Sequence, residues 1–272
     1  MIDIHTHILP NIDDGATSIE ETFNLIKEAK NAGFEAVALT SHYRKGYFET
    51  DTPEREVWVN AIYENLKTKN IDMKLYLGNE IYLSDNMIKY MEDGKASTMN
   101  DTSYVLFEMS IHDEPENLYE MVNKMQQYKI VPILAHPERY EFIQKDPELI
   151  YDLIQKGVLM QADYGSIIGQ YGEKVKIMVK KLFENNMIHM LGSNVHRQNT
   201  IYPKIPECLE NIEEIIGKEK LEKLTTINPM LVLNNKRIEI ETPYEIEYTF
   251  KDKIKFMTGE KLNKIFGKFI TN

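Results

Sequence analysis

Histidine is the residue type in this sequence whose placement most strongly suggests chemistry. The chain has seven histidines, and five of them close or follow short apolar runs: His5, His7, His42, His136 and His196. Alternation along a strand puts residues i and i+2 on one face, so His5 and His7 can reach the same ion. One such pair is commonly a hydrogen-bonded core feature, but five histidines at the same relative position predict a metal site. Of the other two, His112 is expected to be exposed and His189 to be a hydrogen-bonded core residue.

Carboxylates occur at the same relative positions as these histidines. Asp14 follows the first apolar run, Glu80 follows the third, and Glu108 ends the fourth. Imidazole combined with carboxylate is a ligand set that suits Zn²⁺, Mn²⁺ or Fe²⁺. At about three or four protein ligands per ion, this set predicts two or three ions, with Glu80 a candidate bridge between two of them.

Arginines lie close to the predicted ligands. Three of the five arginines in the chain are within three residues of one of them: Arg44, Arg139 and Arg197. A guanidinium donates in a fixed fork that matches phosphate, so the sequence predicts a phosphate ester as substrate. The alternative is that some of them form salt bridges, with Arg139 pairing Glu138 or another acid.

These side chains need elements that bring them together. Apolar runs that predict strands cover residues 2–7, 34–41, 73–78, 104–109, 130–135, 158–162 and 187–192, and amphipathic segments that predict helices cover 18–32, 53–69, 115–128, 147–156 and 171–185. Regular alternation of this kind predicts an α/β fold with parallel strands inside and helices outside. Seven strands with polar residues after so many of them favour a barrel over an open doubly wound sheet, because barrel strands end at a common mouth.

Composition narrows the class of protein. The net charge of −11 argues against nucleic acid as a partner. Mean hydropathy is −0.43, no apolar run of about 18 residues occurs, and the N-terminus lacks the pattern of a signal peptide. We therefore expect a cytoplasmic protein without a transmembrane segment.

The single cysteine does not suit a thiol-dependent phosphatase. Such an enzyme needs an arginine six residues after a thiolate of low pKa, and Glu214 stands at that distance from Cys208. The acids Glu207 and Glu210 would raise the pKa of the thiol. A packing role is therefore expected, and one cysteine fits a reducing compartment.

The last residues differ from the rest of the chain. We expect a barrel domain over residues 1–242 and a basic, amphipathic C-terminal extension over 243–272. Residues 251–272 contain six lysines against two acids, and the apolar side chains there recur at helical spacing: Leu262, Ile265, Phe266, Phe269 and Ile270. Two interpretations stand: a helix packed on the barrel, or a helix that docks on a membrane surface or a partner protein.

Together these residues resemble the PHP (polymerase and histidinol phosphatase) superfamily over residues 1–233. The matching motifs are DIHTH at 3–7, DDG at 13–15, TSH at 40–42, GNE at 78–80, Glu108, AHPERY at 135–140 and SNVH at 193–196. Within the superfamily the chain looks most like the bacterial manganese-dependent protein-tyrosine phosphatases of the CpsB/YwqE type. The stretch SHYRKGYFET at 41–50 is the most specific for that group.

The resemblance implies a distorted seven-stranded (β/α) barrel of PHP/TIM-like form, with manganese as the expected metal. It implies three ions, held by His5, His7, Glu80 and Asn194, by Glu80, Glu108 and His136, and by Asp14, His42 and His196. It further implies that phosphotyrosine is the substrate. We expect hydrolysis by a metal-bridging hydroxide, with one or more of Arg44, Arg139 and Arg197 on the phosphoryl group. The implied substrate is a bacterial tyrosine kinase of capsule or exopolysaccharide synthesis.

One position departs from the family pattern. The family has aspartate where this chain has Asn194. An amide oxygen can ligate a metal, but it is neutral and cannot act as a base. Two alternatives to the phosphotyrosine hypothesis therefore stand: a small-molecule phosphoesterase such as a histidinol phosphatase, and a weakly active variant that binds metal and phosphoprotein.

Overall fold

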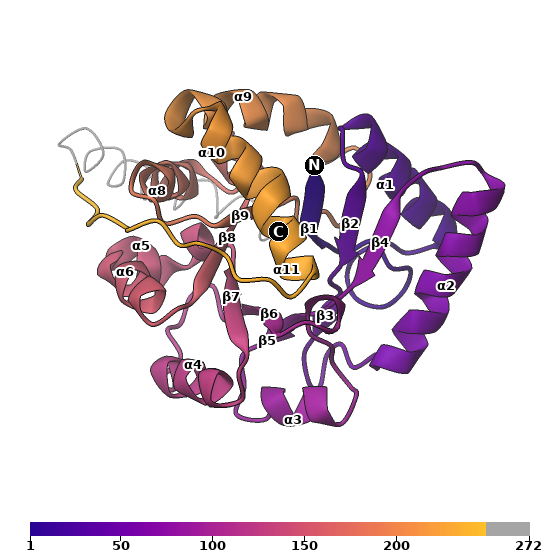
Figure 1. Cartoon of the computed structure of the whole chain (residues 1–272), viewed down its shortest axis with the longest axis horizontal. Helices are drawn as coiled ribbons and strands as arrows, with labels where there is room; N and C mark the ends of the chain where they lie inside the picture. Colours follow the sequence, from indigo (N-terminus) through magenta and orange to yellow (C-terminus); the bar gives the residue numbers. More distant parts are fainter. Residues whose placement is uncertain (249–272) are drawn as a thin grey trace, which may run out of the picture.

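The protein is a curved parallel sheet surrounded by helices (Figure 1), and the computed structural model describes residues 1–248. Within these residues there are nine strands: β1 (Ile2–Thr6), β2 (Ala36–Leu39), β3 (His42–Tyr43), β4 (Lys74–Leu77), β5 (Glu80–Tyr82), β6 (Tyr104–Glu108), β7 (Val131–Ala135), β8 (Leu159–Asp163) and β9 (Met190–Gly192). All strand pairs are parallel. The predicted α/β fold is confirmed.

Helices follow the strands on the outside of the sheet. The longer ones are α1 (Ile19–Asn31), α2 (Thr52–Thr68), α4 (Leu118–Gln127), α6 (Glu148–Gln155), α8 (Glu173–Glu184) and α9 (Ile205–Ile216). The shorter ones are α3 (Met87–Glu92), α5 (Glu141–Lys145), α7 (Tyr164–Ile167), α10 (Lys218–Glu222), α11 (Asn228–Leu233), η1 (Met99–Asp101), η2 (Pro137–Arg139), η3 (Tyr202–Lys204) and η4 (Lys223–Ile227). The five predicted helices correspond to α1, α2, α4, α6 and α8.

Two of the seven predicted strands are interrupted, which is why the described chain has nine. The predicted strand 34–41 corresponds to β2, which ends at Leu39, and a separate short strand, β3, starts at His42. The predicted strand 73–78 corresponds to β4, which ends at Leu77, and β5 starts at Glu80. At the first break the Thr40 hydroxyl bonds to the backbone of Thr6 in place of a regular ladder. The sheet therefore divides into the orders β1-β2-β4 and β3-β5-β6-β7-β8-β9. The breaks matter for function because they pair His42 with Glu80 across β3 and β5.

Hydrogen bonds between β1 and the segment after β9 join the two ends of the sheet. The Asn194 amide donates to the His5 carbonyl at 2.9 Å, and the His7 amide donates to the Val195 carbonyl at 2.9 Å. Thr6 and Val195 form an isolated parallel bridge there. This seam brings the first and last strands together, so that seven strand positions surround one axis as a distorted barrel.

The hydrophobic core has two parts. The larger cluster includes Leu25, Val37 and Leu182, and lies between the sheet and the outer helices. The smaller one joins residues at the starts of the strands, such as Ile2 and Leu159, to Val232 and Leu233 of α11. Short helix α11 therefore covers the end of the barrel where the strands begin, and leaves the other end free for polar residues.

The chain after α11 has no regular secondary structure as far as residue 248. It passes in front of β7 and β8 toward α8 (Figure 1), and the Tyr244 amide donates to the carbonyl of Asn185, the residue after α8, at 3.0 Å. Most of the predicted extension 243–272, including its amphipathic helix, lies outside the described residues and stays a prediction. Every helix in residues 1–248 is too short or too polar to cross a membrane.

Candidate metal centre

The side chains predicted to bind metal meet at the end of the barrel where the strands finish. His5 lies in β1, His42 and Glu80 open β3 and β5, and Glu108 ends β6. The others follow a strand: His7 comes after β1, His136 after β7, and Asn194 and His196 after β9. Gly192 is required beside them, because a Cβ there would lie 2.6 Å from the Cβ of His5.

Glu80 is the centre of this cluster and is fully buried. Its Oε2 lies 3.1 Å from His5 Nε2, 3.3 Å from His7 Nε2 and 3.1 Å from His42 Nδ1. Its Oε1 lies 2.9 Å from His136 Nε2. One carboxylate thus touches four imidazoles that come from three different parts of the sequence.

The donor atoms form three overlapping groups. Within each group the atoms lie within 4.8 Å of one another, a spacing that fits a divalent cation. The groups are His5, His7 and Glu80; His42, Glu80 and Glu108; and His7, Asp14, His42 and His196. They resemble the sets implied by the family, but His7 also joins the group of Asp14, His42 and His196, and Asn194 is in none of the three. His42 lies beside Glu108 as well as Asp14, and His136 contacts Glu80 without entering a group with Glu108.

Unsatisfied polar atoms support the same interpretation. Within the described residues, Asn194 Oδ1 is buried and lacks a hydrogen-bond partner, while buried Glu80 Oε2 and His42 Nδ1 contact only other side chains of the cluster. Buried polar atoms are costly to leave unpaired, so such a concentration at one place fits a bound cation. The residues present therefore fit a cluster of divalent ions.

The carboxylates strongly perturb the imidazoles. Although burial acts to lower it, the nearby Glu80 carboxylate raises the pKa of His5 to about 9. Glu80 and then Glu108 likewise raise the pKa of His42 to about 10 against the effect of burial. The same contacts hold the pKa of Glu80 well below its usual range despite its burial. Protons therefore occupy these imidazoles in the metal-free protein, and cations must displace them.

Polar partners outside the cluster orient the rings. His7 Nδ1 lies 2.8 Å from Asp13 Oδ2, and His5 Nδ1 lies 2.6 Å from Gln161 Oε1. Hydrogen bonds of this kind fix the tautomer and leave Nε2 free for a metal. Neither Asp13 nor Gln161 was predicted as a site residue. The acidic pair at 13 and 14 was a signal for Asp13, whereas Gln161 lies inside an apolar strand and gave none.

Buried Arg55 is a further residue that the sequence did not identify. It donates to the Gly78 carbonyl at 2.6 Å and to the hydroxyls of Thr52 and Ser97 at 3.0 and 3.1 Å. It thereby holds the break between β4 and β5 that places Glu80 in the cluster.

The three predicted arginines have different surroundings. Arg139 Nη1 lies 3.4 Å from Asp163 Oδ2, and its guanidinium lies 4.3 Å from the centre of the Tyr171 ring. Arg44 lies between the rings of Tyr47 and Tyr82, at 4.2 and 4.1 Å from their centres.

Arg197 differs from the other two, because it donates to the carbonyls of Gly15 and His196. The salt-bridge alternative thus describes Arg139, whose partner is Asp163 and not Glu138.

Asn194 is held by a carboxylate that the sequence analysis also missed. Its Nδ2 donates to Asp163 Oδ2 at 3.0 Å, and its backbone φ of 51° is in the left-handed region that asparagine tolerates. Next to this pair, burial and the nearby Asp163 raise the pKa of Glu138 to about 8. Glu138 therefore keeps its proton at neutral pH and is neutral beside Asp163.

The remaining predictions concern residues away from the cluster. His112 is exposed, with its Nδ1 2.9 Å from Glu141 Oε1, and His189 is buried, with its Nδ1 accepting from the Met160 amide at 3.0 Å. Both predictions are confirmed. Cys208 is buried too, and burial followed by the effect of Glu207 raises the pKa of its thiol to about 12, as a packing role requires.

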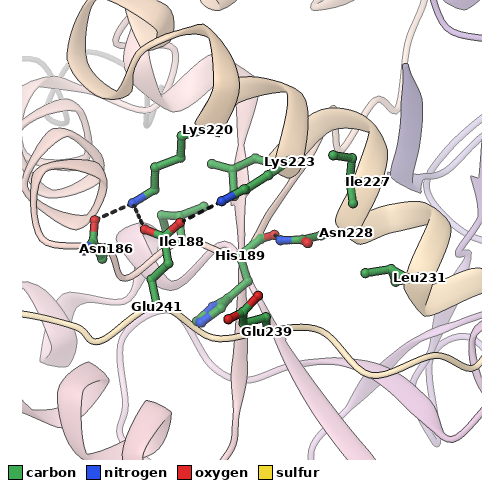
Figure 2. A pocket seen from close by; sticks show the side chains of 11 residues that line it. Asn186, Ile188, His189, Lys220, Lys223, Ile227, Asn228, Leu231, Glu239 and Glu241 are labelled. Carbon is green, nitrogen blue, oxygen red and sulfur yellow. Dashed lines mark hydrogen bonds and ion pairs between the residues drawn. The ribbon is translucent and has the colours of Figure 1, made fainter.

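A cavity of about 240 Å³ lies at the opposite end of the barrel, where the strands begin (Figure 2). Its charged groups neutralise one another: Lys220 contacts both Asn186 and Glu241, and Lys223 Nζ lies 3.5 Å from Glu241 Oε1. None of the possible metal-binding groups in residues 1–248 is located there. The chemistry is therefore at the mouth of the barrel.

A parallel barrel whose strand ends gather histidines and carboxylates around one buried acid defines a metal-dependent hydrolase. The model of the capsular polysaccharide synthesis family CpsB/CapC matches residues 1–234. The chain belongs to this family, which confirms the resemblance found in the motifs.

Individual relatives agree with this assignment. The tyrosine-protein phosphatase CpsB of Streptococcus pneumoniae is 29% identical over 245 residues, which cover 88% of this chain and 100% of that protein. A solved structure from the pair YwqE of Bacillus subtilis and CpsB of S. pneumoniae, described as unique metal-dependent tyrosine phosphatases, is 29% identical. It superposes with a TM-score of 0.86 over 91% of this chain and 100% of that one.

A more distant structure shares the fold alone. The histidinol phosphate phosphatase of Lactococcus lactis, solved with zinc, L-histidinol and phosphate, is 15% identical with a TM-score of 0.56. The match covers 82% of this chain and 94% of that one.

Proposed function

We propose that this protein is a metal-dependent protein-tyrosine phosphatase that hydrolyses phosphotyrosine on a protein. The observation that carries the proposal is the buried Glu80 carboxylate, which contacts four imidazoles within 3.3 Å at the mouth of the barrel. Membership of the CpsB/CapC family and the phosphatase names of its relatives support it.

In this proposal the cluster binds two or three divalent ions, with manganese as the first choice and iron or zinc as alternatives. The proposed ligands are His5, His7, Asp14, His42, Glu80, Glu108, His136, Asn194 and His196. Bound ions of this kind act as Lewis acids toward phosphoryl oxygens and lower the pKa of a coordinated water. Asp13 and Gln161 orient His7 and His5 for this task.

Arginines bind the phosphoryl group in this scheme. Arg139 is the strongest candidate, because contacts with Asp163 and Tyr171 hold its guanidinium in one orientation before a substrate arrives. Arg44, between two tyrosine rings, and Arg197, beside His196, complete the proposed set. Donors fixed in advance stabilise the charge that develops on phosphoryl oxygens. Tyrosinate leaves readily, since the pKa of its conjugate acid is about 10.

An open groove beside the cluster suits a protein substrate. A depression of about 400 Å³ is lined by Arg44, Tyr82, Leu83, Met109 and Pro115, together with polar Ser110, Asp113 and Glu114. It adjoins Glu108, whose carbonyl accepts from the Leu83 amide at 2.9 Å. Aromatic and apolar walls next to a phosphate site can receive the ring of phosphotyrosine and its neighbours. We infer that the substrate is a tyrosine kinase of capsule or exopolysaccharide synthesis in the cytoplasm.

The test is to measure phosphate release by the full chain with Mn²⁺ from a phosphotyrosine peptide and from histidinol phosphate. We expect turnover of the peptide, much slower turnover of histidinol phosphate, and loss of both with EDTA. A matched variant, His112→Gln, removes an exposed histidine outside the cluster and should retain Mn²⁺-dependent phosphate release. Turnover of histidinol phosphate alone would overturn the proposal, and peptide binding without any release would favour a binding module.

A further inference from the structure

The carboxylate of Asp163 lies beside Asn194, the position at which the family has aspartate. We infer that Asp163 supplies the negative charge that Asn194 lacks and fixes its amide so that the oxygen faces a metal ion. The inference rests on the proposed metal centre and adds a positioning residue to it.

Asp163 is buried and connected to both sides of the cluster. Its Oδ2 accepts from Asn194 Nδ2 at 3.0 Å, and its Oδ1 accepts from Gln161 Nε2 at 3.2 Å. The oxygen of Gln161 in turn lies 2.6 Å from His5 Nδ1. Asp163 therefore touches one proposed ligand directly and a second one through a single side chain.

The contact determines which way the Asn194 amide points. A carboxylate only accepts hydrogen bonds, so the NH₂ group of Asn194 must face Asp163 and the oxygen must face away. That oxygen, Oδ1, is buried and has no hydrogen-bond partner among residues 1–248. A cation is the partner that a buried, oriented and otherwise unpaired amide oxygen fits.

The charge of the cluster also supports this role of Asp163. An aspartate at 194 would contribute one negative charge to the cluster, and asparagine contributes none. The Asp163 carboxylate returns that charge within hydrogen-bonding distance of the same amide, in a buried site where it is weakly screened.

Asp163 also pairs with Arg139 at 3.4 Å, which offers a competing explanation. If holding Arg139 were its only role, loss of the carboxylate would raise the KM for substrate and leave metal affinity unchanged. The inference predicts instead that loss of the Asp163 carboxylate reduces metal affinity, even in the absence of substrate.

Exchanging the two residues tests the inference. In Asp163→Asn two amides face each other, and the single oxygen of the new amide cannot accept from both Asn194 and Gln161. In Asn194→Asp two carboxylates face each other at about 3 Å, which disfavours ionisation of both.

The double variant Asp163→Asn/Asn194→Asp restores the match between the two positions. It keeps the hydrogen bonds that join positions 161, 163 and 194, with the direction between the last two reversed, and it keeps the total charge. It gives up the contact between position 163 and Arg139, so metal affinity that it recovers cannot come through that arginine.

The experiment measures Mn²⁺ affinity by titration calorimetry for wild type, both single variants and the double variant. Asp163→Asn should weaken the affected ion by about 10- to 100-fold, the usual loss for a residue that orients a ligand. The double variant should recover affinity to within about threefold of wild type. Asp152→Asn on α6, an exposed acid with the same change of charge, serves as control and should bind as wild type does.

The outcomes separate the two claims. Unchanged Mn²⁺ affinity in Asp163→Asn, or a double variant no better than the single one, overturns the inference and leaves the metal centre intact. A wild-type chain that binds no Mn²⁺ overturns the proposed function as well. Should Asp163→Asn fail to fold in the metal-free state, the double variant is compared with Asn194→Asp: it should bind Mn²⁺ more tightly, and equal or weaker binding overturns the inference.

Discussion

The two ends of the barrel both bury histidine, and they treat it in opposite ways. At the end where the strands finish, His5 lies beside Glu80, which raises its pKa to about 9 against the effect of burial. At the end where they begin, His189 bonds to the Met160 amide (Figure 2 shows its surroundings), and burial followed by the charge of Lys220 lowers its pKa to about 4. Burial and a lysine thus keep His189 neutral, whereas Glu80 favours the charged form of His5 at the place where a cation would bind.

Charge balance distinguishes the two ends further. The two lysines that line the cavity beside His189 are balanced by two acids there, Glu239 and Glu241, and both lysines contact Glu241. At the mouth, Glu80 Oε2 contacts only imidazole nitrogens of the cluster, and Asn194 Oδ1 has no hydrogen-bond partner within residues 1–248. The functional end of this barrel is therefore marked by a buried carboxylate that histidine ring nitrogens surround.

The largest effect is expected from Glu80→Gln, which removes the charge that four imidazoles share. Activity should fall by more than about 1,000-fold, beyond the loss of one oxyanion-hole donor, because metal binding fails. Phosphate release and bound manganese, measured by elemental analysis, check this. A Glu80→Gln variant that kept its metal would show that the mouth does not depend on this carboxylate.

The next effect concerns the pH dependence of the metal-free protein. His5 and His42 have pKa values of about 9 and 10 in the folded chain, against 6.5 as the ordinary value. A raised pKa contributes stability that is complete below pH 6.5 and disappears as the pH rises through 9 and 10. The free energy of unfolding in EDTA should fall over that range by on the order of 3 kcal/mol from His5 alone, with a further loss from His42.

Thermal unfolding in EDTA from pH 6.5 to 10 measures this loss. The metal-saturated protein should lack it, because cations have replaced the protons. Equal pH dependence with and without Mn²⁺ would contradict the assignment of these imidazoles to the metal.

Arg139→Lys should reduce kcat by about 100-fold, in the range found when one oriented donor to a transition-state oxyanion is lost. Lysine keeps the charge but loses the fork and the contact with the Tyr171 ring. Arg197→Lys is the matched comparison and should have a smaller effect, because Arg197 donates to backbone carbonyls. Steady-state kinetics on a phosphotyrosine peptide decide the order, and an equal loss in both would contradict the special role of Arg139.

The smallest effect is expected at the end of the barrel where the strands begin. There the pH dependence of stability has the opposite sign to that of His5 and His42. The pKa of His189 is lowered, so its contribution to stability is present above pH 6.5 and is lost as the pH falls toward 4. Between pH 7 and 5 this loss amounts to about 2 kcal/mol. His189→Gln in EDTA should flatten the acid side of the stability curve and leave the alkaline side unchanged. A change on the alkaline side would mean that the two ends are coupled.

The strands and the histidines proposed to bind metal could be predicted from the sequence, whereas the breaks between strands could not. The strands and the five histidines at their ends follow from hydrophobic periodicity and from the rule that parallel strands end together. The breaks after β2 and β4 could not be predicted, because they depend on contacts between distant residues, such as Arg55 with the Gly78 carbonyl.

Residues that support the ligands were harder to identify than the ligands. Gln161 and Asp163 lie in β8, whose sequence gave the pattern of a buried strand, and their role depends on His5 and Asn194 far away in the chain. For the same reason Asn194 alone suggested a defect in charge, whereas the fold provides a carboxylate beside it.

The most direct test of the central claim is anomalous X-ray scattering from crystals of the full chain soaked in Mn²⁺. We predict two or three anomalous peaks around the Glu80 carboxylate, within coordination distance of the histidines at the mouth, and none in the cavity beside His189. Soaked crystals without a peak at Glu80 would contradict the assignment of this cluster as the metal centre.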